Sequence, residues 1–277
     1  MSALYVVATP IGNLEDLTTR AARVLREVDV IAAEDTRHTA KLLSANAIQT
    51  PVVACHDHNE AEVAGTLVER LVRGEQVALV SDAGTPLLSD PGYRLVRAAL
   101  DAGVRVVPVP GASALTAALS VAGLPTDRFC FEGFLSAKQA QRVRQLEALA
   151  REPRTIVLYE APHRIQALVQ DVVTTLGGAR EISIARELTK QYEQVWSGTA
   201  SAAADALADG SIPQKGEFVV LIGGAPRSDD GVTEDDRRAM SLLLQELPPG
   251  KAAALGAELL GKPRKVLYDI ALQLKKE

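Results

Sequence analysis

Three loops rich in proline and glycine constrain the fold of this chain more than any other feature of its sequence. Each loop follows a short apolar run and leads into a stretch in which apolar residues recur at helical spacing. The loops cover residues 10–13 (Pro-Ile-Gly-Asn), 83–86 (Ala-Gly-Thr-Pro) and 110–113 (Pro-Gly-Ala-Ser). Repeated strand–loop–helix units predict an α/β fold with a mostly parallel sheet and right-handed crossovers. Because ligands bind beyond the carboxyl ends of such strands, the loops are predicted to shape a ligand site.

The second loop lies in the most informative stretch, from Val77 to Gly92. An apolar run that predicts a buried strand gives way to small and turn-forming residues, and a helix is expected from about Pro91 to Ala102. Gly84 and Gly92 permit a positive φ or a close approach of the backbone to a ligand. A single loop of this kind is more typical of an ordinary connection, but its recurrence favours a ligand site.

The same alternation of strands and helices continues through the first 226 residues. One amphipathic helix is predicted from Leu14 to Val28 with Asn13 as its N-cap, and a long polar helix is predicted over 137–150. Gly123 to Asp127 is typical of a linker, so we expect an N-terminal α/β domain over 1–120 and a second one over 121–226. Further strands are predicted near residues 4–8, 29–33, 104–109, 128–134, 154–160, 181–187 and 217–222.

The tail over 227–277 changes character and is predicted to be helical. Helices are expected over 233–247, over 251–260 and from about Arg264, with a tight turn at Gly261-Lys262-Pro263. Two short helices across such a turn resemble a helix-turn-helix. From Lys251 onward there are six basic and three acidic residues, which is consistent either with contact to nucleic acid or with a solvated packing helix.

Composition bounds the class of protein. Hydrophobic residues make up 47% of the chain and charged residues 23%, as in ordinary globular proteins. Two cysteines are too few for a disulfide framework or a cysteine-based zinc site. No signal peptide and no long apolar span is evident, so we expect a cytoplasmic protein without a membrane segment. The formal net charge of −5 does not exclude a nucleic-acid substrate, which needs only a local basic patch.

Several common motifs are absent from the sequence. There is no phosphate-binding G-x-x-x-x-G-K-[ST] loop, no G-x-G-x-x-G after the first strand, and no H-E-x-x-H or C-x-x-C. The segment His56-Asp57-His58 has no clear third ligand and is more typical of a polar loop than of a metal site. We therefore predict no metal.

The loops and their neighbouring charges together resemble the tetrapyrrole methylase superfamily. Within it, the order of motifs is most similar to the small-subunit ribosomal RNA methyltransferase I family. Members that act on tetrapyrroles carry Gly-Asp-Pro where this chain has Gly84-Thr85-Pro86, which favours the ribosomal RNA branch. The resemblance covers about residues 3–225 and extends to the helical tail. The motifs that carry it span residues 8–17, 34–39, 81–86, 89–92, 109–114, 159–164 and 185–190.

The resemblance implies two α/β domains of the tetrapyrrole methylase type with an S-adenosylmethionine cleft between them, plus the helical extension. It implies methylation of the ribose 2′-hydroxyl of a cytidine in the decoding region of small-subunit ribosomal RNA. The expected substrate is the assembled subunit, and the expected oligomer is a homodimer. The positions that match the family's cofactor contacts are Pro10, Ile11, Thr85, Leu88, Ser113, Ala114, Tyr159, Ala185 and Phe218.

The chemistry of methyl transfer suggests further site residues. Transfer from a sulfonium is an in-line displacement, so positioning of methyl group and nucleophile supplies most of the catalysis. A ribose hydroxyl is a poor nucleophile, and a base or a nearby cation should assist it. Among the charged residues at strand ends, Asp35 or Glu187 is predicted to be the base, and Arg37 and Arg186 to steer phosphate or stabilise charge. Structural ion pairs and helix caps are the alternative for each.

Two other functions remain open from the sequence. A C-methyltransferase for a corrin or porphyrin precursor would share the fold and cofactor, although the Gly-Thr-Pro run and the basic tail argue against it. A non-catalytic module could bind the cofactor without turnover. Transfer of labelled methyl groups to RNA separates both from the leading hypothesis.

Overall fold

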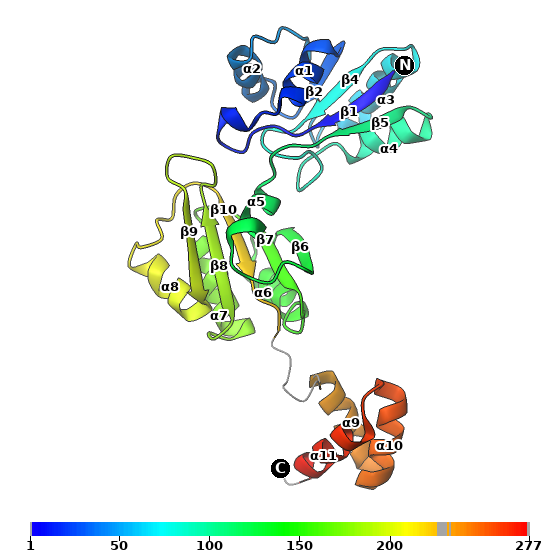
Figure 1. Ribbon diagram of the computed structural model, residues 1–277, viewed down its shortest axis with the longest axis vertical. Coiled ribbons are helices and arrows are strands. Elements are labelled where there is room, and N and C mark those ends of the chain that lie inside the picture. Colours follow the sequence, from blue (N-terminus) through cyan, green and yellow to red (C-terminus); the bar gives the residue numbers. More distant parts are fainter. Residues whose placement is uncertain (1, 226–231, 233, 276–277) are drawn as a thin grey trace. The chain divides into compact units, whose positions relative to one another are not determined.

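The computed structural model describes residues 2–225, 232 and 234–275, and it divides into two compact units over Met1–Gly224 and Ala225–Glu277 (Figure 1). The first unit contains two five-stranded sheets, and the second is helical. These features confirm the predicted fold class of two α/β sheets with a helical extension. None of the helices within the described ranges is long and apolar enough to cross a bilayer.

The first sheet is entirely parallel and has the strand order β3-β2-β4-β1-β5. Its central strands are short apolar runs that are buried on both faces, as expected where helices cover a parallel sheet on each side. The order makes β4, β1 and β5 neighbours, so the three proline- and glycine-rich loops leave adjacent strands at one edge. The strands are β1 (Ala3–Val7), β2 (Val30–Ala33), β3 (Val52–Ala54), β4 (Val77–Val80) and β5 (Arg105–Val109).

Helices cover both faces of this sheet. On one face, the apolar sides of α3 (Glu60–Val72) and α4 (Tyr93–Asp101) form a core with β4. On the other face, the apolar side of α1 (Thr19–Glu27) forms a second core with residues of α2 (Thr36–Ala45). The prediction of a single helix from Leu14 to Val28 is wrong. A short 3-10 turn (η1, Leu14–Asp16) comes first and has Asn13 as its cap, and α1 begins after Thr18, whose hydroxyl accepts from the amide of Ala21.

The second sheet is mixed, with the order β6-β7-β10-β8-β9. β6 and β7 are parallel, whereas β10 runs antiparallel to both of its neighbours and β9 antiparallel to β8. The segment 187–193 between β8 and β9 is too short for a parallel crossover, which forces the antiparallel pairing. The strands are β6 (Phe129–Phe134), β7 (Thr155–Glu160), β8 (Glu181–Arg186), β9 (Gln194–Thr199) and β10 (Phe218–Ile222).

The two faces of the second sheet have different coverings. Helices α6 (Gln139–Ala148), α7 (Ile165–Leu176) and α8 (Ala200–Ala208) pack on one face. The other face packs against α5 (Ala114–Val121), the helix that follows the third loop of the first sheet. This helix therefore connects the two sheets, and the predicted domain boundary between residues 120 and 121 stays a prediction.

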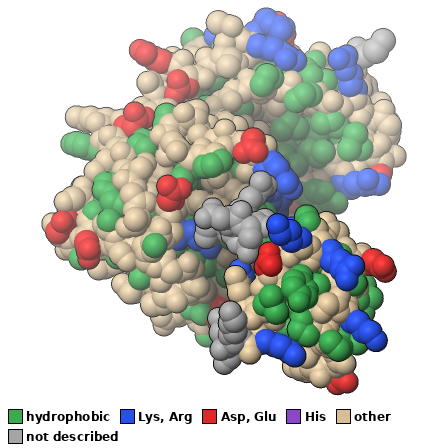
Figure 2. Space-filling model, turned by 60° about the horizontal axis from the view of Figure 1, so that its bottom comes forward, with side chains coloured by type: hydrophobic (Ala, Val, Ile, Leu, Met, Phe, Trp, Pro, Cys, Tyr) green, Lys and Arg blue, Asp and Glu red, His purple; other side chains and the backbone are tan. Residues whose placement is uncertain are grey.

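The helical unit contains α9 (Glu234–Glu246), α10 (Pro249–Leu260) and α11 (Arg264–Leu274). Its core is small and includes Met240, Leu267 and Ile270. Gly261 ends α10 in the left-handed region with φ 63°, as the predicted turn requires. Thr233, where the first helix was expected to begin, lies outside the described residues. Figure 2 shows apolar and basic side chains together on the forward face of this unit.

Candidate functional site

A cavity of about 320 Å³ lies in the first unit, and residues of both sheets line it. Small-molecule sites in proteins begin at about this size, on the order of 300 Å³. The lining is mostly apolar with a few convergent polar groups, as is typical of a site for an organic ligand. The lining residues are Ile11, Ala83, Gly84, Thr85, Leu88, Ser89, Asp90, Ser113, Ala114, Phe134, Tyr159, Glu160, Ala161, Pro162, Ala185, Leu188, Glu217, Phe218 and Val219.

Backbone hydrogen bonds hold the three loops of the first sheet together at the cavity. Thr9 and Gly84 exchange both of their backbone bonds, at 2.8 and 3.1 Å, so the first and second loops form a small antiparallel bridge. The Thr85 hydroxyl donates to the carbonyl of Ala112 at 3.1 Å and ties the second loop to the third. Gly84 has φ +85°, and an added Cβ would lie 3.3 Å from Cγ2 of Ile11. The close approach of these loops therefore depends on glycine at this position.

Aromatic side chains form part of the wall that the second sheet contributes. Tyr159 packs edge-on against Phe131 and Phe134, with ring centroids 4.9 and 5.6 Å apart. Burial raises the pKa of the Tyr159 hydroxyl, so that group stays protonated at neutral pH. The tyrosine thus offers the cavity a rigid apolar surface with a polar end.

The cavity brings together eight of the nine residues that the sequence predicted to contact the cofactor. These eight come from loops and strand ends of both sheets, and their contact with a cofactor stays a prediction. Pro10, the ninth, is buried beside Ile11 but does not line the cavity. The eight are Ile11, Thr85, Leu88, Ser113, Ala114, Tyr159, Ala185 and Phe218.

Asp35 and Arg37, two of the predicted catalytic residues, pair with each other. The carboxylate of Asp35 accepts from the Arg37 backbone amide at 2.8 Å and from its guanidinium at 2.8 and 3.2 Å. The Arg37 guanidinium holds the pKa of Asp35 well below its ordinary value. Asp35 also caps α2, and the side chain of Arg37 is 88% exposed. Neither residue lines the cavity, and their catalytic role stays a prediction.

Arg186, the other predicted cation, is buried at the end of β8. Its guanidinium donates to the carbonyl oxygens of Lys215, at 2.6 Å, and Tyr192, at 2.9 Å. These bonds fix the segments that lead into β10 and β9. The structure therefore places Arg186 as a brace for the cavity wall, and it does not line the cavity itself.

Glu187, the other predicted base, lies next to the cavity. Its Oε1 accepts from Lys190 Nζ at 2.9 Å and from the Glu217 backbone amide at 3.0 Å. Burial alone would raise the pKa of Glu187, but the hydrogen bonds from Lys190 and Glu217 outweigh it and lower the pKa. The residue has φ 50°, an uncommon conformation for a side chain with a Cβ. Its neighbours Leu188 and Glu217 line the cavity.

Two acidic residues that line the cavity were not among the predicted catalytic residues. Asp90 follows Leu88 in the second loop, and Glu160 follows Tyr159 at the end of β7. Burial raises the pKa of both groups. Glu160 belongs to the wider set of strand-end charges in the sequence, but Asp90 was missed, although it lies in the stretch that first indicated a ligand site.

Within the described part of the chain, no group of three or more histidine, cysteine, aspartate or glutamate side chains could hold a metal ion. His56 and His58, the histidines considered from the sequence, lie with their ring centroids 6.0 Å apart.

Two family models match this chain. Residues 3–204 match the model described as Tetrapyrrole (Corrin/Porphyrin) Methylases. Residues 230–275 match the model described as the RsmI C-terminal HTH domain. The two matches cover the α/β unit and the helical tail respectively.

Curated relatives are similar over nearly the whole chain. The protein named Ribosomal RNA small subunit methyltransferase I from Pseudomonas aeruginosa is 53% identical over 272 residues, which cover 98% of this chain and 96% of that protein. Its namesake from Escherichia coli O157:H7 is 48% identical, with coverage of 98% and 94%. The Synechocystis protein of the same name is 49% identical, with coverage of 99% of each.

Solved structures share the fold at lower sequence identity. The methyltransferase CobJ matches with a TM-score of 0.61 at 20% identity, over 81% of this chain and 95% of that one. Uroporphyrin-III C-methyl transferase from Thermus thermophilus, complexed with S-adenyl homocysteine, matches with a TM-score of 0.55 at 22% identity, over 80% and 97%. Likenesses at this level of identity establish the fold alone.

Proposed function

This chain belongs to the ribosomal RNA small-subunit methyltransferase I family, and from that premise we propose that it methylates small-subunit ribosomal RNA with S-adenosylmethionine as cofactor. The single observation that carries the proposal is sequence identity of about half, which extends over the α/β unit and the helical tail together. The tail match is informative, because the tetrapyrrole methylase fold by itself serves several substrates.

The cofactor fits the residues of the cavity. Loops held by their own backbone bonds would bind it through amides, carbonyls and small side chains, and Tyr159 and Phe218 would cover it. When bound, S-adenosylmethionine supplies a methyl group on a positively charged sulfur. The task of the chain is then to hold the acceptor oxygen in line with that methyl group and to exclude water.

The proposed acceptor is the 2′-hydroxyl of a cytidine ribose in the decoding region. This hydroxyl must lose its proton as the new bond forms, and we propose Asp35 or Glu187 as the base. Glu187 is the better placed of the two, because its neighbours Leu188 and Glu217 line the cavity. Its lowered pKa keeps the carboxylate ionised at neutral pH. Arg37 and Arg186 are the proposed cations for phosphate or developing charge.

The wider setting of the reaction is also proposed. The substrate is the assembled subunit, the enzyme acts as a homodimer, and the reaction takes place in the cytoplasm. The helical tail contacts the RNA. In support of the last point, the basic residues Lys251, Arg264 and Lys265 are exposed on this unit, and Figure 2 shows basic side chains on its forward face.

Methyl transfer from labelled S-adenosylmethionine tests the proposal. The purified chain is incubated with assembled small subunits, with free small-subunit RNA, or with a tetrapyrrole precursor. We expect label in the subunit, and nucleoside analysis should recover it as 2′-O-methylcytidine at one position. Label on the tetrapyrrole precursor, or on no RNA at all, would overturn the proposed function.

A further inference from the structure

A second pocket, of about 200 Å³, lies between α1 and the edge strand β5 on the face of the first sheet that α1 covers. Three arginines line this arginine pocket: Arg20 and Arg23 from α1, and Arg105 from β5. A spacing of three residues places Arg20 and Arg23 on the same side of the helix. Arg105 lies two residues before the buried Val107, another lining residue, so both face α1. Segments far apart in the chain thus bring three cationic side chains around one concave surface.

Two of these arginines have no counter-charge. Arg23 donates to Glu27, which also lines the arginine pocket, at 2.7 Å, and both side chains are more than half exposed. Arg20 and Arg105 are exposed, and within the described ranges neither forms a hydrogen bond or an ion pair. The arginine pocket therefore has an excess of positive charge in a chain whose formal net charge is −5.

The arginine pocket also contains a neutral donor. The hydroxyl of Tyr5 donates to Oε1 of Gln76 at 3.0 Å, and both of these half-buried residues line the pocket. This bond uses the acceptor of the Gln76 amide and leaves its nitrogen as a donor. The neighbouring carboxylate of Asp29 accepts from the backbone amide of Gln76 at 2.7 Å. Guanidinium groups beside an amide donor suit an anion with several oxygens, such as a phosphate group.

An open groove of about 420 Å³ lies between the arginine pocket and the cofactor cavity. The groove shares Ile11 and Ser113 with the cavity. It extends to Thr18, the cap of α1, and Arg20 of the arginine pocket follows two residues later. Gly111, on the opposite side of the groove, comes two residues after the end of β5, the strand that carries the third arginine. Cavity, groove and arginine pocket therefore form one path along this side of the unit.

We propose that the arginine pocket binds a phosphate of the substrate RNA, on a strand that runs through the groove to the cofactor cavity. The inference rests on the proposed function, which supplies the RNA. The charged residues that line the cavity are all acidic, so phosphate is repelled there and needs cations elsewhere. A nucleic-acid strand carries a phosphate on every nucleotide and can reach both places at once. Arg20 and Arg105 thus position the RNA and do not take part in methyl transfer.

The double variant Arg20→Gln/Arg105→Gln tests this contact in the full chain. With assembled small subunits, KM should rise by about 10-fold, while kcat and the calorimetric affinity for S-adenosylmethionine stay unchanged. In filter binding to free small-subunit RNA, the slope of log affinity against log salt should fall by about 0.7 to 1, the loss of one phosphate contact. Arg20→Lys/Arg105→Lys keeps both charges and should restore most of the RNA affinity.

The matched control is Arg73→Gln/Arg97→Gln. It removes the same charge from the helices on the other face of the first sheet, where the two side chains are 61% and 62% exposed. Neither KM nor the salt dependence should change in this control. Equal losses in both double variants would mean that only the net charge of the protein matters, which overturns the contact.

Three further outcomes overturn the contact. Unchanged RNA affinity in Arg20→Gln/Arg105→Gln would remove the arginine pocket from RNA binding. Unchanged RNA affinity with lost calorimetric binding of inorganic phosphate would assign the pocket to a free anion. A dimeric wild type and a monomeric variant in sedimentation would assign this face to a second copy of the chain. Wild-type protein that binds RNA through these arginines but transfers no methyl group refutes the proposed function and leaves the contact intact.

Discussion

The two sheets build their sides of the cavity by different means. On the first sheet, backbone groups hold the loops: Thr9 and Gly84 exchange amide bonds, and Thr85 bonds to the carbonyl of Ala112. Even the buried carboxylate of Glu60 in this sheet's helical layer accepts from backbone amides, those of Arg94 and Leu95, at 2.7 and 3.1 Å.

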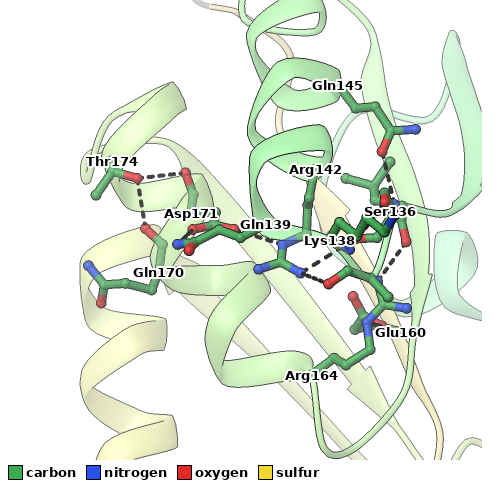
Figure 3. A network of polar contacts seen from close by, with 12 residues as sticks. Ser136, Lys138, Gln139, Arg142, Gln145, Glu160, Arg164, Gln170, Asp171 and Thr174 are labelled. Carbon is green, nitrogen blue, oxygen red and sulfur yellow. Dashed lines mark hydrogen bonds and ion pairs between the residues drawn. The ribbon is translucent and has the colours of Figure 1, made fainter.

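In the second sheet and the helices on it, buried arginines hold distant segments together. Arg142 and Asp171 form an ion pair at 2.7 Å with both side chains only 5% exposed, and Figure 3 shows the pair joining α6 to α7. Gln139 donates to the other carboxylate oxygen at 3.2 Å. Arg186 bonds to two carbonyls, and Arg180 donates to the carbonyls of Gly223 and Ala150 at 3.2 and 2.9 Å.

The difference shows that a fold can be held by local backbone contacts or by side chains that join distant segments. Backbone-held loops need glycine and proline at particular positions, and such residues are visible in a short stretch of sequence. Buried arginines join segments that are far apart along the chain, as Arg142 and Asp171 do. Substitutions in the two regions should therefore damage the protein in different ways.

The largest effect is expected for Arg142→Met. This change leaves Asp171 buried without its cation, which should cost about 3–5 kcal/mol of unfolding free energy. Urea denaturation followed by fluorescence of Trp196, the single tryptophan, measures the effect within the second sheet. The control is Arg97→Met in the helices that cover the first sheet. Arg97 pairs with Asp101, and the two side chains are 62% and 58% exposed. Its loss should be at most about 1 kcal/mol, and equal losses would contradict the comparison.

Arg186→Met should have the next largest effect and separates two roles for this residue. As a brace, it would lose two charge-assisted bonds to carbonyls, with a cost of about 2–3 kcal/mol in stability. Cofactor affinity should fall, because Arg186 bonds to Lys215 and the cavity residues Glu217 and Phe218 follow directly. The kcat at saturating cofactor should stay within a few-fold of wild type. The catalytic role predicted from the sequence requires the reverse, a large fall in kcat with unchanged affinity and stability.

Gly84→Ala should have the smallest effect on stability and a selective effect on binding. A residue with a Cβ at φ +85° costs about 1–2 kcal/mol, and here the Cβ also presses on Ile11. Gly103→Ala is the matched control, since its φ is +71° and an added Cβ meets nothing within 4 Å. Thermal unfolding should show similar losses for both variants. Calorimetry should show weaker cofactor binding for Gly84→Ala alone, and equal binding would remove this loop from the site.

Local patterns were enough to predict much of the first sheet and its part of the cavity. The three proline- and glycine-rich loops were predicted from local patterns, and the family resemblance carried by these stretches implied Ile11, Thr85, Leu88 and Ser113 as cofactor contacts; all four line the cavity. The helix boundary near Asn13 was wrong because two caps, Asn13 and Thr18, lie close together, and periodicity alone cannot separate a 3-10 turn from the helix that follows.

The charged residues were harder to interpret. Asp35 and Glu187 were singled out by their places at strand ends, but position in the sequence does not show which carboxylates have cations beside them. Asp35 pairs with Arg37, Glu187 with Lys190 and Glu160 with Arg164.

The sequence by itself determined the family, the alternation of strands and helices, and the glycine and proline loops, because each of these depends on residues close together in the chain. Only the tertiary structure decided that β4, β1 and β5 lie side by side, so that three loops converge on one cavity. It likewise decided that the Glu160 side chain is fully buried beside Arg164 and that Arg186 bonds to the carbonyls of Lys215 and Tyr192. Burial and charge pairing arise from contacts between distant segments, and the free energy of a charged group depends on both.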